Sequence, residues 1–457
     1  MKRVLAILLS CLMIIASFGA CSNKPAESKN DSETEQSTTQ DGTSENSDWT
    51  TKKVTLTFLH GHTDEGVAKV ITSKGFRTMV DKFIAEHPNV TIEEQKNSDL
   101  GPLLLQQAAA NNLPDVIQTT YGQMPATAGT GQLADITDLV DPNMYIGKLF
   151  SETWDGKIYG LAMKGTEYNL LWYNSNMLKE AGLDEFPTKM DDLLALDKYF
   201  DAKGIDLIAL GNNVAWYTPA CLFGPIFYEK LGLEKGQSLV LSDGTVKWTD
   251  PAVIEAMSWL PKIAATCNED FNQQDDIWAA GWYAQGKAFC YPGGSWVAST
   301  IKTFENDYPD VVAATRCALV PSISGEKANT YIMAAEAEGY SINSRLKRGT
   351  PEFDAAFALI SQICSKDYAE MMAENGTISA PISDKKVDTS SFPQMTQDFI
   401  AIHNAGYTSA LTLQSYIDVS VFNALTPELQ TIMGGTNTPE QAAANVQAAL
   451  DAKLSQK

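Results

Sequence analysis

The chain has little positive charge for its size. Its 457 residues include 34 Lys and Arg against 56 Asp and Glu, which gives a net charge of −22 and a pI near 4.6. Nucleic acids and anionic bilayers are bound through cationic surfaces, so this composition argues against both as partners. The hydrophobic fraction of 44% is that of a globular body. The acidity by itself predicts solubility.

Histidine is scarce as well, because the chain holds only four. Two of them, with two carboxylates, fall in the segment His60 to Glu65, directly after an expected strand. Such a group could hold a metal ion, but the other two histidines lie in unrelated contexts, so we predict neither a metal site nor a cofactor. Asp64 is expected either to contact hydroxyl groups of a ligand or to belong to a plain polar turn.

The seven cysteines show no spacing typical of a disulfide framework or a metal site. Cys11 lies in an apolar leader and Cys21 directly follows that leader, which leaves five cysteines in the body: Cys221, Cys267, Cys290, Cys317 and Cys364. These five cannot all pair with one another. We therefore expect buried free thiols, with one disulfide still open.

The apolar leader is shorter than the roughly 20 residues that a membrane-spanning helix needs. It has a positive start, Met1 to Arg3, an apolar core, Val4 to Phe18, and small residues before Cys21. This pattern predicts a signal peptide over residues 1–20 and resembles the lipobox of bacterial lipoproteins, in which the cysteine carries the lipid. Residues 21–52 are too polar to fold, so we expect a disordered tether on the extracellular face of the cytoplasmic membrane.

The body, about four hundred residues from Lys53 onward, is long enough for two packed lobes. Strand patterns at 54–59, 90–93 and 116–117 alternate with helical patterns at 76–87 and 103–111. This alternation predicts an α/β fold, in which ligands bind at the carboxyl ends of the strands. Tyr121 follows the third strand, so we expect it at that edge.

The stretch Gly156 to Leu183 is predicted to cross between the lobes. We expect a strand at 157–162, an irregular strap at 163–166, a buried strand at 168–173 and a short helix at 177–181. Lys164 and Glu167 then lie where the two sheets face each other, unless this is an ordinary connection with a solvated glutamate. Two later segments, 336–342 with Glu338 and 376–382, are predicted as further returns between the lobes.

The second half continues the alternation of strands and helices. Thr188 and Asp191 are expected to cap a helix over 190–202, and further helices are predicted over 253–266, 351–365 and 438–454, with strands at 206–210 and 288–290. Four tryptophans could stack on a ligand ring, with core or lobe-interface packing as the alternative: Trp216, Trp278, Trp282 and Trp296. For Trp172 and Trp259 we prefer core packing.

Several segments, in this order, resemble a known family. They are the lipobox at Cys21, the strand entry Pro114-Asp115-Val116, GQLADIT at 131–137, GKIYGL and LLWYN near the crossover, FPTKMDDLLAL at 186–196, GKAFCYPGGSW at 286–296 and TPEQAAANVQAAL near the end. Together they resemble the extracytoplasmic solute-binding proteins (family 1 type) of carbohydrate ABC transporters, which are bacterial lipoproteins.

The resemblance implies a two-lobed, type II periplasmic-binding-protein-like fold with hinge crossovers and a helical C-terminal part. It implies an N-terminal lobe from 53–165 and 335–378, and a C-terminal lobe from 166–334 and 379–457. By their positions in the matching motifs, Glu167 is expected to contact sugar hydroxyls, Trp296 to stack on a ring and Tyr121 to add a polar contact. Ala162 replaces a proline common in the family, and the segment 335–339 replaces a glycine-rich one.

The resulting hypothesis is a non-enzymatic, monomeric receptor that closes on a sugar and delivers it to ABC transporter permease subunits. The residues expected at its ligand are Asp64, Tyr121, Glu167, Trp216, Trp278, Trp282, Trp296 and Glu338. Two alternatives stay open at this point. The same fold could bind a polyamine or another polar solute through its acidic groups, or the chain could be a secreted glycoside hydrolase.

Overall fold

A computed structural model describes residues 49–97, 100–146, 148–325, 331–382, 387–405 and 407–455. The strands are β1 (Val54–His60), β2 (Val90–Lys96), β3 (Val116–Thr119), β4 (Thr153–Trp154), β5 (Lys157–Ile158), β6 (Gly160–Glu167), β7 (Leu170–Asn174), β8 (Asp206–Ile208), β9 (Ala288–Gly293), β10 (Thr315–Leu319), β11 (Tyr331–Ile342) and β12 (Thr408–Leu411). The α-helices are α1 (Asp64–Lys69), α2 (Ile71–Glu86), α3 (Leu100–Ala109), α4 (Ser175–Glu180), α5 (Met190–Leu194), α6 (Asp197–Asp201), α7 (Gly224–Leu231), α8 (Leu233–Val240), α9 (Pro251–Ser258), α10 (Leu260–Ala264), α11 (Asp276–Ala284), α12 (Val297–Lys302), α13 (Pro309–Ala314), α14 (Pro351–Ile363), α15 (Lys366–Glu374), α16 (Gln394–Asn404), α17 (Leu413–Tyr416), α18 (Val419–Met433) and α19 (Pro439–Leu454).

The first sheet has the strand order β12-β11-β3-β1-β2, with β6 paired to β11. Strand β1 is parallel to both β2 and β3, so the carboxyl ends of the three strands meet at one edge. The connecting helices α2 and α3 are predicted correctly, although each begins several residues before its expected start. As predicted, the residues after His60 and after Thr119 therefore lie at the carboxyl edge of a sheet.

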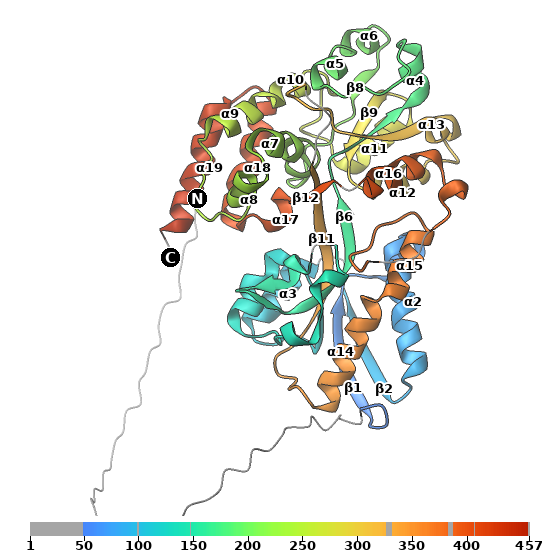
Figure 1. The fold of residues 1–457 in the computed structure, drawn as a ribbon, viewed down its shortest axis with the longest axis vertical. Coiled ribbons are helices and arrows are strands. Elements are labelled where there is room, and N and C mark those ends of the chain that lie inside the picture. The colour runs from blue at the N-terminus through green and yellow to red at the C-terminus, as the bar shows by residue number, and fades with distance from the viewer. Residues whose placement is uncertain are drawn as a thin grey trace, which may run out of the picture. The chain divides into compact units, whose positions relative to one another are not determined.

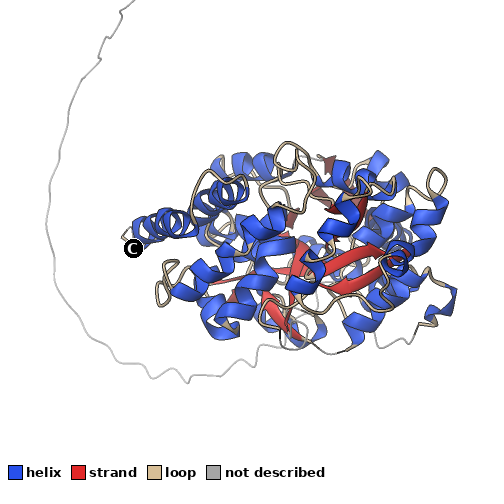
Figure 2. Ribbon diagram, turned by 90° about the horizontal axis from the view of Figure 1, so that it is seen from above, coloured by secondary structure: helices blue, strands red, loops and turns tan. Residues whose placement is uncertain are grey.

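The second sheet has the order β10-β7-β9-β8. Strand β9 is antiparallel to β7 and parallel to β8, which places the residues after Gly293 beside the start of β7. Figure 2 shows helices on both sides of the strands. The predicted strands at 206–210 and 288–290 are both present, and the second is longer than expected.

Strands β6 and β11 run side by side in the middle of Figure 1 and connect the two sheets. The strap predicted at 163–166 is wrong as a separate segment, because these residues belong to β6, but the irregularity is present as register shifts in the pairing with β11 around Lys164. Their polar and apolar residues fail to alternate because nearly every residue of β6 is buried. On one face, a side chain at Gly165 would lie 2.5 Å from Ile146 Cδ1 and 2.8 Å from the Ser379 carbonyl oxygen. Of the two later returns, 336–342 lies within β11, whereas 376–382 meets β6 only at the isolated bridge between Lys164 and Ser379.

Two helix predictions are corrected. Thr188 does not cap a helix: α5 starts after Lys189 without a side-chain cap, because the backbone here pairs with Ser322 instead. The helices expected over 190–202 and 253–266 are each broken into two, the second just before Pro261. The C-terminal helix α19 begins as predicted, with Thr438 as its cap.

The core confirms the packing predicted for Trp172 and Trp259, which are 0% and 7% exposed. The five body cysteines are free thiols, and four of them are buried. Burial raises the pKa of Cys221 and Cys364, which keeps both thiols protonated. The signal peptide and nearly all of the tether predicted before Lys53 lie outside the described residues.

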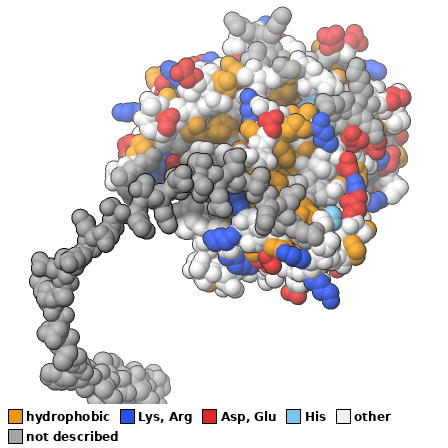
Figure 3. Space-filling view, turned by 60° about the horizontal axis from the view of Figure 1, so that its bottom comes forward, with side chains coloured by type: hydrophobic (Ala, Val, Ile, Leu, Met, Phe, Trp, Pro, Cys, Tyr) orange, Lys and Arg blue, Asp and Glu red, His pale blue; other side chains and the backbone are white. Residues whose placement is uncertain are grey.

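The surface carries its charge in mixed form. On the face shown in Figure 3, acidic and basic side chains are interspersed, although acidic residues outnumber basic ones in the chain. Within the described residues, every helix is too short or too polar to cross a membrane.

Candidate functional site

The chain leaves the first sheet and enters the second at Glu167, Tyr168 and Asn169. Asn169 has a left-handed backbone (φ 80°), a conformation that asparagine tolerates better than most residues, and this bend separates β6 from β7. Its side-chain amide donates to the Tyr331 carbonyl at 2.7 Å and so ties the bend to the start of β11. Glu167 is therefore the last strand residue before the chain changes sheets.

The Glu167 side chain is buried and is held by a histidine. Its Oε1 lies 2.8 Å from Nδ1 of His403, on α16, whereas its Oε2 is buried without a hydrogen-bond partner. The hydrogen bond from His403 to the carboxylate raises the pKa of the imidazole, and burial of the ring only partly offsets this. The expected alternative of a solvated glutamate does not apply, since only 10% of the side chain is exposed.

Three aromatic rings form a corner beside Glu167. Trp296 packs edge to face against Tyr168, with centroids 5.4 Å apart, and against Trp216, at 5.6 Å. Ser295, next to Trp296, connects these rings to the bend at Glu167. Its backbone N–H donates to the Glu167 carbonyl at 2.9 Å, and its hydroxyl accepts from the Glu167 N–H at 3.3 Å. Trp216 and Trp296 are half-buried and belong to the loops that follow β8 and β9.

A separate charged group lies on the opposite face of β6. Lys164 lies 3.3 Å from Oε1 of Glu338, and His62 Nε2 lies 3.5 Å from the other oxygen. Burial alone would raise the pKa of Glu338, but the charges of Lys164 and His62 outweigh it and lower that pKa. Residues three apart on a strand point to opposite faces, and the different partners of Lys164 and Glu167 agree with this. The two carboxylates predicted to share a site are therefore divided by β6.

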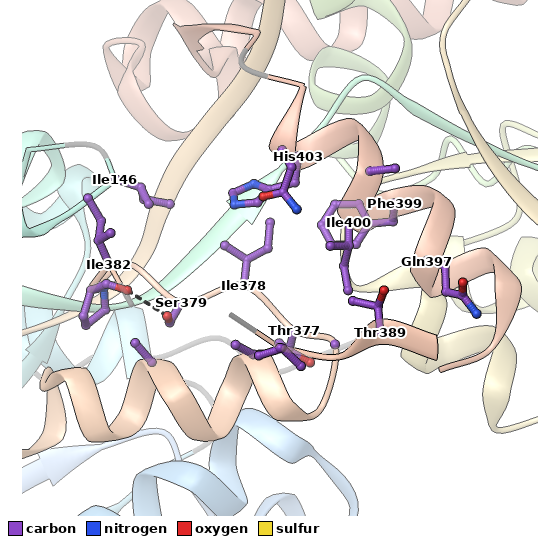
Figure 4. A pocket seen from close by; sticks show the side chains of 17 residues that line it. Ile146, Thr377, Ile378, Ser379, Ile382, Thr389, Gln397, Phe399, Ile400 and His403 are labelled. Carbon is purple, nitrogen blue, oxygen red and sulfur yellow. Dashed lines mark hydrogen bonds between the residues drawn. The ribbon is translucent and has the colours of Figure 1, made fainter. Parts of the chain in front are cut away.

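A cavity of about 690 Å³ adjoins the Glu167–His403 pair through His403. Figure 4 shows His403 and Phe399 of α16 on one side, Ile146 and Ile382 on another, and Ile378 between them. Its volume is in the range of small-ligand sites. Among the described residues that line it, the polar ones apart from His403 are uncharged: Thr377, Ser379, Thr389, Gln397 and Asn404.

The remaining predicted residues lie elsewhere. Trp278 and Trp282 stack on each other on α11 at 5.0 Å, and the indole N–H of Trp282 donates to Asp206 at the amino end of β8, whereas Trp296 follows the carboxyl end of β9. Asp64 is 91% exposed and pairs with Lys96 at 2.8 Å. Tyr121 begins a short helix at the predicted edge, and its side chain lies outside the described residues.

The sequence gives no sign of His403 at this site, whereas Lys164 was expected, with Glu167, where the two sheets face each other. His403 lies 236 residues from Glu167, so no local pattern links the two. Lys164 stood in the segment expected to be an irregular strap. Its pairing opposite Glu338 in the β6–β11 ladder could be found only by aligning the two crossover segments in register.

Comparison with known families settles the class of protein. Residues 78–402 match the family described as bacterial extracellular solute-binding protein. The chain belongs to this family. Its members are extracellular binding proteins, as the resemblance predicted, and the class does not support the glycoside hydrolase alternative.

Individual relatives cover only part of the chain. An uncharacterized ABC transporter extracellular-binding protein of Pyrococcus horikoshii is 29% identical over 237 residues, which are 50% of this chain and 54% of the relative. The diacetylchitobiose binding protein DasA of Streptomyces coelicolor is 30% identical over 230 residues, 46% of this chain and 49% of the relative. The chain thus spans about half the length of the curated relatives it matches.

Solved structures match over a larger share. A chitin oligosaccharide binding protein superposes with a TM-score of 0.72 at 23% identity, covering 88% of this chain and 98% of that protein. The solute-binding protein RafE in complex with raffinose gives 0.66 at 18% identity, covering 87% and 99%. These similarities confirm the predicted type II periplasmic-binding-protein-like fold.

Proposed function

We propose that the protein is a lipid-anchored receptor that captures an oligosaccharide beside Glu167 and delivers it to the permease of an ABC transporter. Relatives of this chain support both sugar capture and delivery to an ABC transporter, since they include ABC transporter binding proteins and two diacetylchitobiose binding proteins. The same sugar class recurs in the chitin oligosaccharide binding protein of similar fold. A chito-oligosaccharide is therefore the first ligand to test.

The observation that carries the proposal is the pairing of a held carboxylate with an aromatic corner at the bend between the sheets. Sugars present hydroxyl groups that need hydrogen-bond acceptors and C–H faces that pack on aromatic rings. Glu167 supplies the acceptor, and Trp296 with Trp216 supplies the rings, joined through the two hydrogen bonds of Ser295. Tyr121, after β3 of the first sheet, stays a predicted contact.

The pairing of the carboxylates on both faces of β6 favours an uncharged ligand over a polyamine. Glu167 is paired with His403, and Glu338 lies between Lys164 and His62. Each carboxylate thus has a cationic or titratable partner within the protein, and a polyamine would have to displace it. Neutral hydroxyl groups can bind without breaking these pairs.

The anchor rests on the sequence alone. The leader before Cys21 has the charge, length and small residues of a lipoprotein signal, and a lipid there would hold the receptor at the extracellular face of the cytoplasmic membrane. Labelled palmitate fed to producing cells should enter the wild-type protein and not Cys21→Ala. Equal labelling of both would remove the anchor from the proposal.

Calorimetry with purified protein tests the ligand. We expect diacetylchitobiose or a longer chito-oligosaccharide to bind and to raise the melting temperature by mass action, with raffinose and xylo-oligosaccharides as comparison sugars. Affinity should change little between low and high salt, whereas spermidine binding would weaken steeply. Binding of spermidine and of none of the sugars would overturn the proposal in favour of the polyamine.

A further inference from the structure

Glu167 has two unlike oxygens. One accepts from His403 at 2.8 Å, and the other is buried without a hydrogen-bond partner. A buried carboxylate oxygen left unsatisfied costs roughly 1–3 kcal/mol, so a donor that reaches it is bound favourably. The protein thus fixes one oxygen of the carboxylate and keeps the other buried without a partner, so that only a donor entering beside the bend can satisfy it.

His403 is placed to hold this arrangement. It lies in the last turn of α16 and borders the cavity, while its Nδ1 faces Glu167 on the crossover strand. We propose that His403 is a positioning residue of the ligand site: it fixes one oxygen of Glu167 and thereby presents the other oxygen to a hydroxyl group of the bound sugar. This inference rests on the proposed function.

The surroundings make the bond depend on pH. Among the described residues, Glu167 is the acidic group paired with His403, and no other residue lining the cavity carries a titratable group. Asp398 on the same helix is instead near Arg316 of β10, at 3.8 Å. Loss of the His403 proton removes the positive charge from the donor, so the ion pair is lost and the hold on Glu167 weakens.

The sign follows from the pKa of His403, which Glu167 raises above its usual 6.5. Below that raised pKa the imidazole is charged and the carboxylate is fixed. As the pH rises through it, we expect the association constant for diacetylchitobiose to fall severalfold. A merely structural histidine would change the melting temperature without giving affinity a pH profile.

Two measurements test the inference. Histidine NMR of the ligand-free protein should show a pKa for His403 above 6.5 that drops in Glu167→Gln. Calorimetry with diacetylchitobiose from pH 5.5 to 8.5 should show affinity falling in the wild type, and lower, pH-independent affinity in His403→Gln. His87→Gln is the matched control, since His87 packs on Trp49 and Phe83 at the far end of α2 and should leave the profile unchanged.

The outcomes separate this inference from the proposed function. If sugars bind and His403→Gln keeps the wild-type pH profile, the positioning role is wrong and the receptor stands. If the pKa of His403 is the same in Glu167→Gln as in the wild type, the charge pair itself is wrong. If no sugar binds, the proposed function fails and the acceptor role of Glu167 fails with it, while the NMR result still decides whether the pair exists.

Discussion

Trp296 offers the sharpest test of the aromatic corner. Replacing it with alanine removes two edge-to-face contacts, with Tyr168 and with Trp216. Each such contact is worth about 0.5–1.5 kcal/mol, so Trp296→Ala should lower the free energy of unfolding by about 1–3 kcal/mol. If Trp296 also anchors the sugar, binding should lose at least about 2 kcal/mol, which is roughly a 30-fold rise in Kd.

A matched tryptophan separates binding from stability. Trp282 is also half-buried, and Trp282→Ala removes a comparable stack with Trp278 and the bond to Asp206. We expect a similar loss of stability by urea unfolding, about 1–3 kcal/mol, with an unchanged Kd by calorimetry. A Kd that rises for Trp282→Ala and stays constant for Trp296→Ala would refute the placement of the site.

Three further predictions concern packing and pH. Gly294→Ala would place a Cβ 2.6 Å from the Glu167 carbonyl, so we expect a loss of about 1–3 kcal/mol by urea unfolding, whereas Gly122→Ala, with open space around it, should be nearly neutral. Burial would raise the pKa of Glu94, but His60, 3.5 Å away, and the hydrogen bond and charge of Arg77 hold it at about 2. Its stabilisation is therefore present above pH 4.5 and is lost as the pH falls through 2, so Glu94→Gln should cost about 2–3 kcal/mol at pH 7 and little at pH 2. Burial lowers the pKa of His62 to about 4, so the folded protein is most stable above pH 6.5, where this side chain is neutral in both states. In urea titrations the free energy of unfolding should fall by about 2–3 kcal/mol between pH 6.5 and pH 4. The same fall should be smaller in His62→Gln.

Part of the first sheet could be predicted because β1 and α2 each bury one face over much of their length. The segment Val54–His60 alternates, and α2 repeats its apolar residues at helical spacing, so local burial appears in the sequence as a period. Strand β6 is the counterexample, since it is covered on both faces and has no period to detect. Its strand character depends on pairing with β11, more than 160 residues later, which no local pattern contains.

Part of the candidate site could also be predicted from local sequence pattern. The positions of Glu167 and Trp296 relative to strand ends could be predicted from the chain, and the structure joins both to Ser295 at the bend. The sequence could not show which of the four candidate tryptophans lie near Glu167, because aromatic character does not indicate which end of a strand a ring reaches. Trp216 and Trp296 follow carboxyl ends, whereas Trp282 contacts Asp206 at an amino end.

The division of charge across β6 bears on how a two-sheet receptor responds to its ligand. Lys164 is tied to Glu338 on β11, and Glu167, three residues later, is tied to His403 on α16, which packs against β10 of the second sheet. On this passage of the chain, a rotation of one sheet relative to the other would be absorbed between these two pairs or at Asn169, just beyond them. Closure that preserves both pairs would therefore confine the backbone change to a few residues, as hinges in proteins do. A ligand hydroxyl bound to the second oxygen of Glu167 would act directly beside that hinge.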